Sequence, residues 1–470
     1  MSLRNWLPCL RRAILVTWLL VSVTLFPLAD ESVTQLEAKP YPLTAASVVR
    51  NWRFDTIAGQ WLPVGPARGP IRSVTISSDL PCLDSLPIST AGGIQLDPAV
   101  TWNPDRDEFL VVWQDGRNGT DLDIYAQRIA PDGRLLGDNF ALVVAEFDQW
   151  APWVVYRPAV RGYWLVWHHR QRNSHRVYLQ ALSPSGSPLG HAMPVTTGND
   201  CQQWVPACGY DPVADELLVT WEDMDTSAIA GQRIGGDGAS RGHNIIISAQ
   251  PSSQWAPPVV AYNPMLQEFI VVWDDFTNQT VSAQIVERDG SLRGPNSVIT
   301  RHDNALVSGV VSGGIDAGYW AFWTQEDNNP GQGSDIWGQK LTADGLIIND
   351  ALGIAVEPGS QRDCVAVYDA QQSECVLAWW DGDPETGSSS IKLQHLSWAG
   401  AFLGSRHLVS ATGLSETAPQ LGFSQSHDSY LIAWHTWLDD PSQTNEADIY
   451  GQLYSPQRYH AFVPLCLLAP

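Results

Sequence analysis

The fold is decided by the stretch Phe109-Leu-Val-Val-Trp113, because the chain repeats this pattern at nearly constant intervals. Each copy is a short hydrophobic run that ends in a tryptophan. The tryptophans that end such runs are Trp113, Trp167, Trp221, Trp273, Trp323, Trp379 and Trp434. Successive members of this set are 54, 54, 52, 50, 56 and 55 residues apart. A period of about 50 residues indicates a repeat architecture, and it explains part of the chain's high tryptophan content.

Each repeat contains more than this one run. In the first repeat, Pro98-Ala-Val-Thr-Trp102 precedes the run, Asp123-Ile-Tyr-Ala-Gln-Arg128 follows it, and the turn Asp132-Gly133 leads to another apolar stretch. These segments predict four short strands, because they are rich in β-branched and aromatic residues and are bounded by turn residues. An Asp-Gly pair supplies the positive φ that a tight hairpin between the third and fourth strands requires. No stretch shows sustained helical periodicity.

Seven four-strand repeats predict an all-β fold, a seven-bladed β-propeller of four-stranded antiparallel blades. An open β-solenoid is the alternative, although a strand-turn-strand meander of this length fits a blade better. The seventh repeat, from Pro419 to about Arg458, lacks its fourth strand. The segment Leu86-Pro-Ile-Ser-Thr90 resembles a fourth strand, so we predict that it completes the seventh blade and closes the ring. The propeller would then span residues 86–458, preceded by an extension over 30–85.

The repeat pattern Val-Val-Trp-x-Asp, followed by Asp-Ile-Tyr-Ala-Gln-Arg and Asp-Gly, resembles the tandem propeller repeats of many exported bacterial proteins. It is distantly similar to the TolB-like propeller repeat. The resemblance covers about residues 86–458 and implies the propeller fold, but it says little about function because such folds serve many roles. The apolar tail over 459–470 resembles short tails that end some exported bacterial proteins, which implies a sorting or anchoring element.

Residues 1–29 have the pattern of a secretory signal peptide. Arg4, Arg11 and Arg12 precede an uncharged apolar stretch over 13–26. This stretch is short for a membrane span, which needs about 20 residues. An uncleaved anchor is the alternative, because Pro27 suits a cleavage site poorly. No other segment is apolar enough to cross a membrane, so we expect a secreted or cell-surface protein with no span in its mature chain.

The charge balance and the cysteines narrow the class of protein further. The chain has 50 acidic and 27 basic residues and a net charge of −23, which repels phosphate backbones and argues against nucleic-acid binding. We expect a monomer. Export permits disulfides among the seven cysteines. Their positions suggest Cys201 with Cys208 and Cys82 with Cys466, and buried free thiols are the alternative.

Two recurring features map to one predicted face, where loops after the second strands meet the connections between blades. Gln-Trp pairs in the connections provide indoles, and these are Trp150, Trp204 and Trp255. Acidic residues follow the second strands, among them Asp115, Asp223 and Asp275. Indoles beside carboxylates suit stacked sugar rings or cations. The alternative is structural, with tryptophans wedged between blades and aspartates paired within their own blades, and the repetition favours that alternative.

The second repeat departs most from the pattern. It carries His168-His169-Arg170 and His175 in a region where other repeats have acidic residues. This basic patch would suit an anionic group, or a metal held by two or three imidazoles, and a solvated hairpin is the alternative. Calcium is the one cofactor suggested, by the oxygen-rich loop from Asp115 to Asp123, although its spacing fits a solvated hairpin better.

Standard catalytic motifs are absent from the sequence, which has no Gly-x-Ser-x-Gly elbow, no His-Glu-x-x-His and no phosphate-binding glycine loop. We therefore expect a non-catalytic binding or interaction module for a glycan or a protein partner. The alternative is an extracellular carbohydrate-active hydrolase or lyase at the channel mouth, where Asp97 or Asp363 would supply a carboxylate. A structural surface protein anchored by one terminus is a third option.

Overall fold

The computed structural model describes residues 85–456 except 172–173, 197–201, 249–256, 276, 303, 315, 327–332, 383–387, 413 and 439–445, together with the backbone of 52–55 and 60–63. The chain forms two compact units, Met1–Ser73 and Val74–Pro470. Across the described ranges the regular secondary structure is all strand, with no helix. In the first unit, β1 (Trp52–Asp55) pairs antiparallel with β2 (Gln60–Pro63).

The second unit consists of four-strand sets, each of which corresponds to one repeat of the sequence. Repeat 1 contains β4 (Gln95–Asn103), β5 (Glu108–Asp115), β6 (Asp123–Ile129) and β7 (Phe140–Val143). Repeat 2 contains β8 (Gln149–Arg157), β9 (Gly162–Gln171), β10 (Ser174–Leu182) and β11 (Pro188–Pro194). Repeat 3 contains β12 (Gln203–Asp211), β13 (Glu216–Asp223), β14 (Ala228–Gly235) and β15 (Ser240–Ile246). Repeat 4 contains β16 (Val259–Asn263), β17 (Glu268–Asp275), β18 (Thr280–Val286) and β19 (Leu292–Arg301).

The remaining repeats follow the same plan. Repeat 5 contains β20 (Ala305–Gly313), β21 (Gly318–Glu326), β22 (Gly333–Leu341) and β23 (Ile347–Ala355). Repeat 6 contains β24 (Gly359–Asp369), β25 (Glu374–Gly382), β26 (Ser389–Ser397) and β27 (Phe402–Ser410). Repeat 7 contains β28 (Ser415–Ser424), β29 (Ser429–Leu438) and β30 (Glu446–Tyr454), and β3 (Leu86–Ser89) joins it from the other end of the unit.

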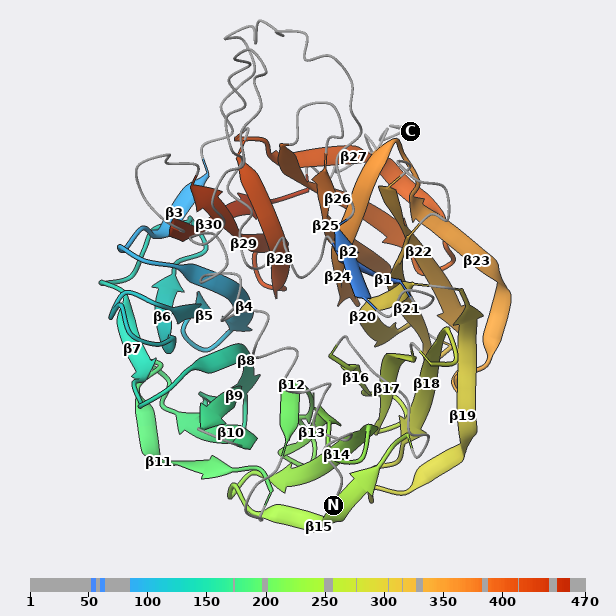
Figure 1. Cartoon of the computed structure of the whole chain (residues 1–470), viewed down its shortest axis with the longest axis horizontal. Coiled ribbons are helices and arrows are strands. Elements are labelled where there is room, and N and C mark those ends of the chain that lie inside the picture. The colour runs from blue at the N-terminus through green and yellow to red at the C-terminus, as the bar shows by residue number, and fades with distance from the viewer. Residues whose placement is uncertain are drawn as a thin grey trace, which may run out of the picture. The chain divides into compact units, whose positions relative to one another are not determined.

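The strands of each set pair antiparallel in chain order, as in β4-β5-β6-β7. A short parallel pairing of β22 with β24 joins repeats 5 and 6 into one larger sheet. The first strand of each set contacts the first strand of the next from β4 to β28, and β28 also contacts β4 (Figure 1). Antiparallel four-strand sets that pack through their first strands are the construction of a β-propeller. The predicted all-β, propeller-type repeat fold is therefore confirmed.

The segment predicted to supply the missing strand of repeat 7 pairs there. Leu86 lies opposite Gly451, and Ser89 lies opposite Ile449, so β3 occupies the outer edge of β30. Repeat 1 also contacts this strand, because the Asn139 side-chain amide donates to the carbonyl of Ile88 at 3.0 Å. Ile88 itself is buried.

The repeated tryptophans form the core. Trp113, Trp221, Trp379 and Trp434 are each 0% exposed, so these indoles are unavailable to a ligand. The hydrophobic clusters cross from one repeat to the next, as where Leu110 of repeat 1 packs in the same cluster as Trp167 and other residues of repeat 2. The hairpin glycines also behave as predicted. The Asp-Gly turns have positive φ at Gly133, Gly238, Gly290 and Gly345.

One of the two disulfides suggested by the sequence is not formed. Cys208 is a free, buried thiol, so the predicted pair of Cys201 with Cys208 is wrong. Cys208 lies in a hydrophobic cluster of repeats 2 and 3, and burial raises the pKa of its thiol to about 12. Cys201, Cys82 and Cys466 lie outside the described residues. Across the described ranges, no helix has the length and apolar character needed to cross a membrane.

Candidate functional site

Four of the predicted site residues form one cluster, which we call the indole–imidazole cluster. It contains Trp150 from β8, His168 from β9, His175 from β10 and Trp204 from β12. His175 stacks on Trp204, with ring centroids 4.0 Å apart and an interplanar angle of 18°. Trp150 stands edge-on to His168 at 5.5 Å and tilts toward Trp204 at 6.4 Å. Two motifs that were separate in the sequence therefore meet at the contact between repeats 2 and 3.

A β-bulge beside each indole determines the direction in which its side chain points. The pairing of β8 with β9 shifts register after Trp150, and that of β12 with β13 shifts register after Trp204. The next residues, Ala151 and Val205, have positive φ values of 47° and 41°. A bulge of this kind bends the strand and redirects the side chain beside it. Both bulges lead into a proline, which has no N–H to donate to the ladder.

The glutamine of each Gln-Trp pair has a different role from its tryptophan. Gln149 is buried, and its amide donates to the carbonyls of Ala145 and Phe147 in the preceding connection. Gln203 is also buried, and its side-chain oxygen accepts a hydrogen bond from the backbone N–H of Val177 at 3.2 Å. The glutamines thus hold the connections in place, whereas the indoles of Trp150 and Trp204 remain partly exposed.

The two histidines of the cluster bond directly to each other. His168 Nε2 and His175 Nδ1 lie 2.8 Å apart, so one ring donates and the other accepts. Burial, aided by the nearby charges of His175, His169 and Arg170, lowers the pKa of His168 well below its usual value. Burial and Arg170 lower the pKa of His175 to about 4. Both rings are therefore neutral near pH 7.

His169 does not join the cluster. It follows His168 along β9, and alternate residues of a strand point to opposite faces. Its Nε2 lies 3.0 Å from the carbonyl of Glu146, and its ring packs near Tyr178. His169 is therefore not brought together with His168 and His175. Among the described residues, no group of three His, Cys, Asp or Glu side chains is placed to hold a metal ion.

The three predicted aspartates each act within their own hairpin. Asp115 is buried and accepts hydrogen bonds from the Trp113 indole at 2.7 Å and from the Arg117 guanidinium at 2.6 Å. Asp223 accepts from the backbone N–H groups that follow it in its turn. Asp275 accepts from the backbone and side chain of Asn278. This geometry favours the structural alternative for these residues over a shared ring of carboxylates.

The remaining predicted positions add no second cluster. In the oxygen-rich loop of repeat 1, Asn118 donates to Asp121 and Asp123, so protein donors already engage these oxygens. Asp97 accepts a hydrogen bond from Gln114 at 3.1 Å. Asp363 lies on β24, which β28 separates from the β4 strand of Asp97. Trp255 lies outside the described residues.

The cluster offers a surface rather than a cage. His168 is 1% exposed, whereas Trp150, Trp204 and His175 are partly exposed. Ring centroids only 4.0 to 6.5 Å apart mean that the rings pack on one another, so a ligand would meet their outer faces. The surface consists mainly of aromatic rings, of which only His175 and Trp204 stack face to face. The Nε2 of His175 is not used by the bond to His168. Such a surface can stack the apolar face of a ring and bond a hydroxyl at its edge.

Comparison with known proteins supports the fold. No protein-family model and no curated protein sequence matches the chain. The chain is similar to the BP39L lectin from Burkholderia pseudomallei, with 13% identity over 76% of this chain and 99% of that chain and a TM-score of 0.55. It is also similar to the polysaccharide lyase Uly1, with 7% identity over 78% and 90% of the two chains and a TM-score of 0.52. The β-propeller domain of the Trilobed protease from Pyrococcus furiosus matches with 8% identity over 80% and 100% and a TM-score of 0.46. At these identities the likeness to the lectin and to the lyase concerns the fold alone. The resemblance to TolB-like repeats stays a prediction.

Proposed function

We propose that the chain is an exported, seven-bladed β-propeller that binds carbohydrate without chemical turnover. The contacts from β4 through the successive first strands to β28, and from β28 back to β4, support a ring of seven blades. The pairing of β3 with β30 supports closure by the N-terminal strand. Closure protects an edge that would otherwise template aggregation.

The single observation that carries the binding proposal is the indole–imidazole cluster. Trp150 and Trp204 come from neighbouring repeats and converge with two imidazoles that are neutral near pH 7. Indole faces stack on the C–H face of a sugar, and a neutral imidazole exchanges hydrogen bonds with its hydroxyls. The cluster breaks the symmetry of the repeats, as a ligand site usually does, because the other repeats have no histidine pair at this place.

Similar structures include a lectin and a polysaccharide lyase, which fits either a binding or a cleaving role. Binding is favoured because the cluster contains no carboxylate. Glycoside hydrolysis needs two carboxyl groups about 5 to 10 Å apart. Asp97 and Asp363, the carboxylates considered for that role, lie on strands that β28 separates.

A glycan array followed by calorimetry tests the binding proposal. We expect Trp150→Ala and Trp204→Ala each to weaken binding by roughly 30-fold or more, because truncating a central aromatic contact commonly costs about 2 kcal/mol. Trp380→Ala is the matched control, since Trp380 is also partly buried and lies opposite Arg362, the repeat-6 counterpart of Trp150. If the double variant Trp150→Ala/Trp204→Ala binds the glycan as tightly as the native chain, the cluster is not the binding site.

Export is tested by the N-terminus of the protein recovered from its native host. The basic and apolar pattern of residues 1–29 predicts that the mature chain begins near Asp30 and lies outside the cytoplasm. Mass spectrometry of the intact protein gives its first residue. A chain that retains Met1 and stays with the membrane fraction would instead support the uncleaved anchor, and a cytoplasmic chain that retains it would contradict export.

A further inference from the structure

One guanidinium borders the indole–imidazole cluster. Arg170 lies on β9, two residues after His168, and directly opposite His175 of β10. Residues directly opposite each other on antiparallel strands share a face, with Cβ atoms about 4.5–5.5 Å apart. Burial lowers the pKa of His168 and of His175, and the charge of Arg170 lowers both further. Arg170 therefore places a positive charge at the edge of the cluster.

The protein engages this guanidinium only lightly. The Arg170 side chain is 49% exposed, and its one ion pair among the described residues joins Nη1 to Asp148 at 3.1 Å. The other carboxylate oxygen of Asp148 accepts from the backbone N–H of Leu122. A guanidinium has five N–H donors in a planar fork, and an ion pair exposed to solvent is weak. Within the part of the chain that the structure describes, Arg170 therefore has donors left for a second anion.

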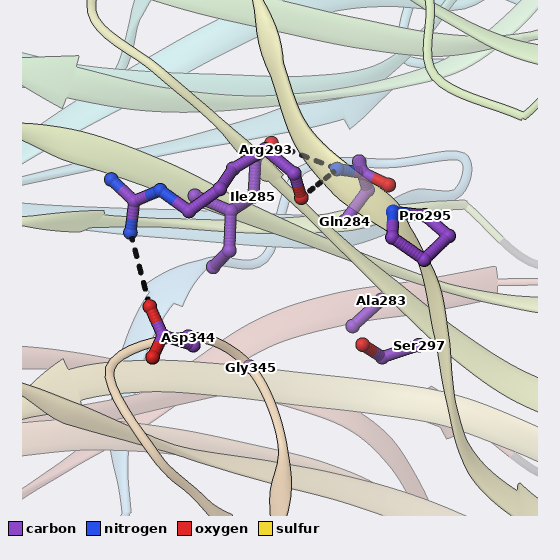
Figure 2. Close-up of a pocket in the computed structure, with 8 residues that line it drawn as sticks. All are labelled: Ala283, Gln284, Ile285, Arg293, Pro295, Ser297, Asp344 and Gly345. Carbon is purple, nitrogen blue, oxygen red and sulfur yellow. Dashed lines mark hydrogen bonds and ion pairs between the residues drawn. The ribbon is translucent and has the colours of Figure 1, made fainter.

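Arg293 of repeat 4 shows the contrasting case, an arginine enclosed by the fold. Its Nε donates to Glu287 at 2.7 Å, and its two terminal nitrogens donate to the carboxylate of Glu268. Its Nη1 also lies 3.8 Å from Asp344, in the turn between β22 and β23 of repeat 5 (Figure 2). Three carboxylates thus surround this guanidinium, whereas Arg170 has one.

The sequence around the cluster is depleted in acidic residues. From Gln149 to Asn199 there is no Asp or Glu, although the whole chain has 50 acidic residues, and the same stretch has five arginines. The two histidines of the cluster are neutral near pH 7, whereas an arginine stays protonated. The charge that repeat 2 presents beside the rings is therefore positive at this pH.

The charge changes sign across the cluster. His175 lies opposite Arg170, whereas Trp204 lies opposite Glu222 of β13. A ligand that stacks on the outer faces of these rings would have an acidic group directed toward Arg170 and away from Glu222, because opposite charges attract and like charges repel. In a uronic acid the carboxylate is bonded to a ring carbon, so it lies at the edge of the sugar ring and leaves the face free to stack.

We propose that the cluster selects a sugar that carries a carboxylate, a uronate, and that Arg170 determines this specificity. The proposal rests on the carbohydrate binding proposed above and names the class of sugar. The planar fork of a guanidinium pairs with a carboxylate through two parallel hydrogen bonds. The indoles supply the stacking surface, and the Nε2 of His175 bonds a hydroxyl. Asp148 and Glu222 flank the cluster, so it suits a single acidic sugar rather than a run of them.

Paired glycans test this specificity by calorimetry with the full chain. Glycans that end in glucuronate, galacturonate or mannuronate are compared with the same glycans ending in glucose, galactose or mannose, which have a hydroxymethyl group in place of the carboxylate. The native chain should bind at least one acidic glycan about tenfold more tightly than its neutral counterpart, because a hydrogen bond to a charged group is among the stronger ones. Arg170→Gln should remove this preference and leave the binding of the neutral glycan unchanged.

Arg161→Gln is the matched control. It makes the same change in charge within the same repeat, and the Arg161 side chain is 73% exposed. Arg161 precedes β9, whereas Arg170 lies near the other end of that strand. At physiological ionic strength a charge acts over only about 8 Å, so the control variant should keep the preference for the acidic glycan.

The outcomes separate this proposal from the proposed function. Equal binding of acidic and neutral glycans, or a preference that survives Arg170→Gln or is lost equally in Arg161→Gln, would overturn the uronate specificity and leave carbohydrate binding intact. Tighter binding of the 6-sulfated glycans would assign the site to sulfate esters, which also overturns it. If no glycan binds, or if Trp150→Ala/Trp204→Ala binds the acidic glycan unchanged, the proposed function fails as well.

Discussion

Ile88→Asp is expected to remove most of the stability of the propeller. Ile88 is 2% exposed and lies in one hydrophobic cluster with Phe109 of repeat 1 and with Leu431 and Ile449 of repeat 7. Truncating such a side chain costs about 2–5 kcal/mol, and burying a carboxylate without a partner costs more. A domain's whole stability is about 5–15 kcal/mol. The four residues of β3 contact both repeat 1 and repeat 7, so under the proposed closure of the ring their loss affects every repeat.

Denaturant unfolding followed by tryptophan fluorescence measures this effect. Ile246→Asp is the matched control, since Ile246 also lies on a fourth strand but is 48% exposed. It should change the free energy of unfolding by no more than about 0.5 kcal/mol. If Ile88→Asp is as mild as Ile246→Asp, then β3 does not close the propeller, and the contact between β28 and β4 must hold the ring by itself.

Repetition made the fold readable from the sequence. All seven repeats have the same buried tryptophan, and four have an Asp-Gly turn at the same place. A signal that is weak in one copy, such as Asp132-Gly133 before a short strand, therefore gains strength from the others. The missing strand was readable for the same reason, since a gap in repeat 7 pointed to a donor such as Leu86-Pro-Ile-Ser. The prediction that Cys208 pairs with Cys201 failed because proximity in sequence does not show which way a side chain faces. Cys208 faces the core.

The sequence predicted the residues of the candidate site but not that they form one cluster. Trp150, Trp204, His168 and His175 were each singled out, but as members of two unrelated motifs. The cross-strand register places Trp150 opposite His168, and only packing between repeats brings Trp204 onto His175. Counting strand positions would have separated His168 from His169, because neighbours on a strand face opposite sides. No count within a single repeat predicts a contact between two repeats.

The histidine pair gives the second large effect, a loss of stability in acid. In the unfolded chain a histidine binds a proton below about pH 6.5, its ordinary pKa. In the folded chain burial lowers the pKa of His175 to about 4 and lowers that of His168 in the same direction. Between these values the unfolded state binds more protons than the folded state, so the free energy of unfolding falls as the pH falls. The stabilising contribution is complete above about pH 6.5 and is lost progressively down to about pH 4.

The size of this effect follows from the shift of His175. The difference between its unfolded and folded pKa values corresponds to at most about 3 kcal/mol, and to about 1–2 kcal/mol once solvent screening of a partly exposed ring is allowed for. Protonating both rings also breaks the bond between His168 Nε2 and His175 Nδ1, because each nitrogen would then carry a hydrogen. His175 stacks on Trp204, so the same change disturbs the surface proposed to bind sugar.

Comparing variants isolates the histidines from the many carboxylates that also titrate in acid. The free energy of unfolding should be measured at pH 7 and pH 4.5 for the native chain and for the double variant His168→Gln/His175→Asn. Glutamine is the residue that repeat 1 has at this position, Gln114, so the first substitution introduces a side chain that the fold already accepts. The double variant should lose about 1–2 kcal/mol less stability between the two pH values than the native chain. His191→Gln, on the exposed face of β11, should not change this difference. Equal acid sensitivity in the native chain and the double variant would show that the two rings are already protonated, or already solvated, in the folded protein.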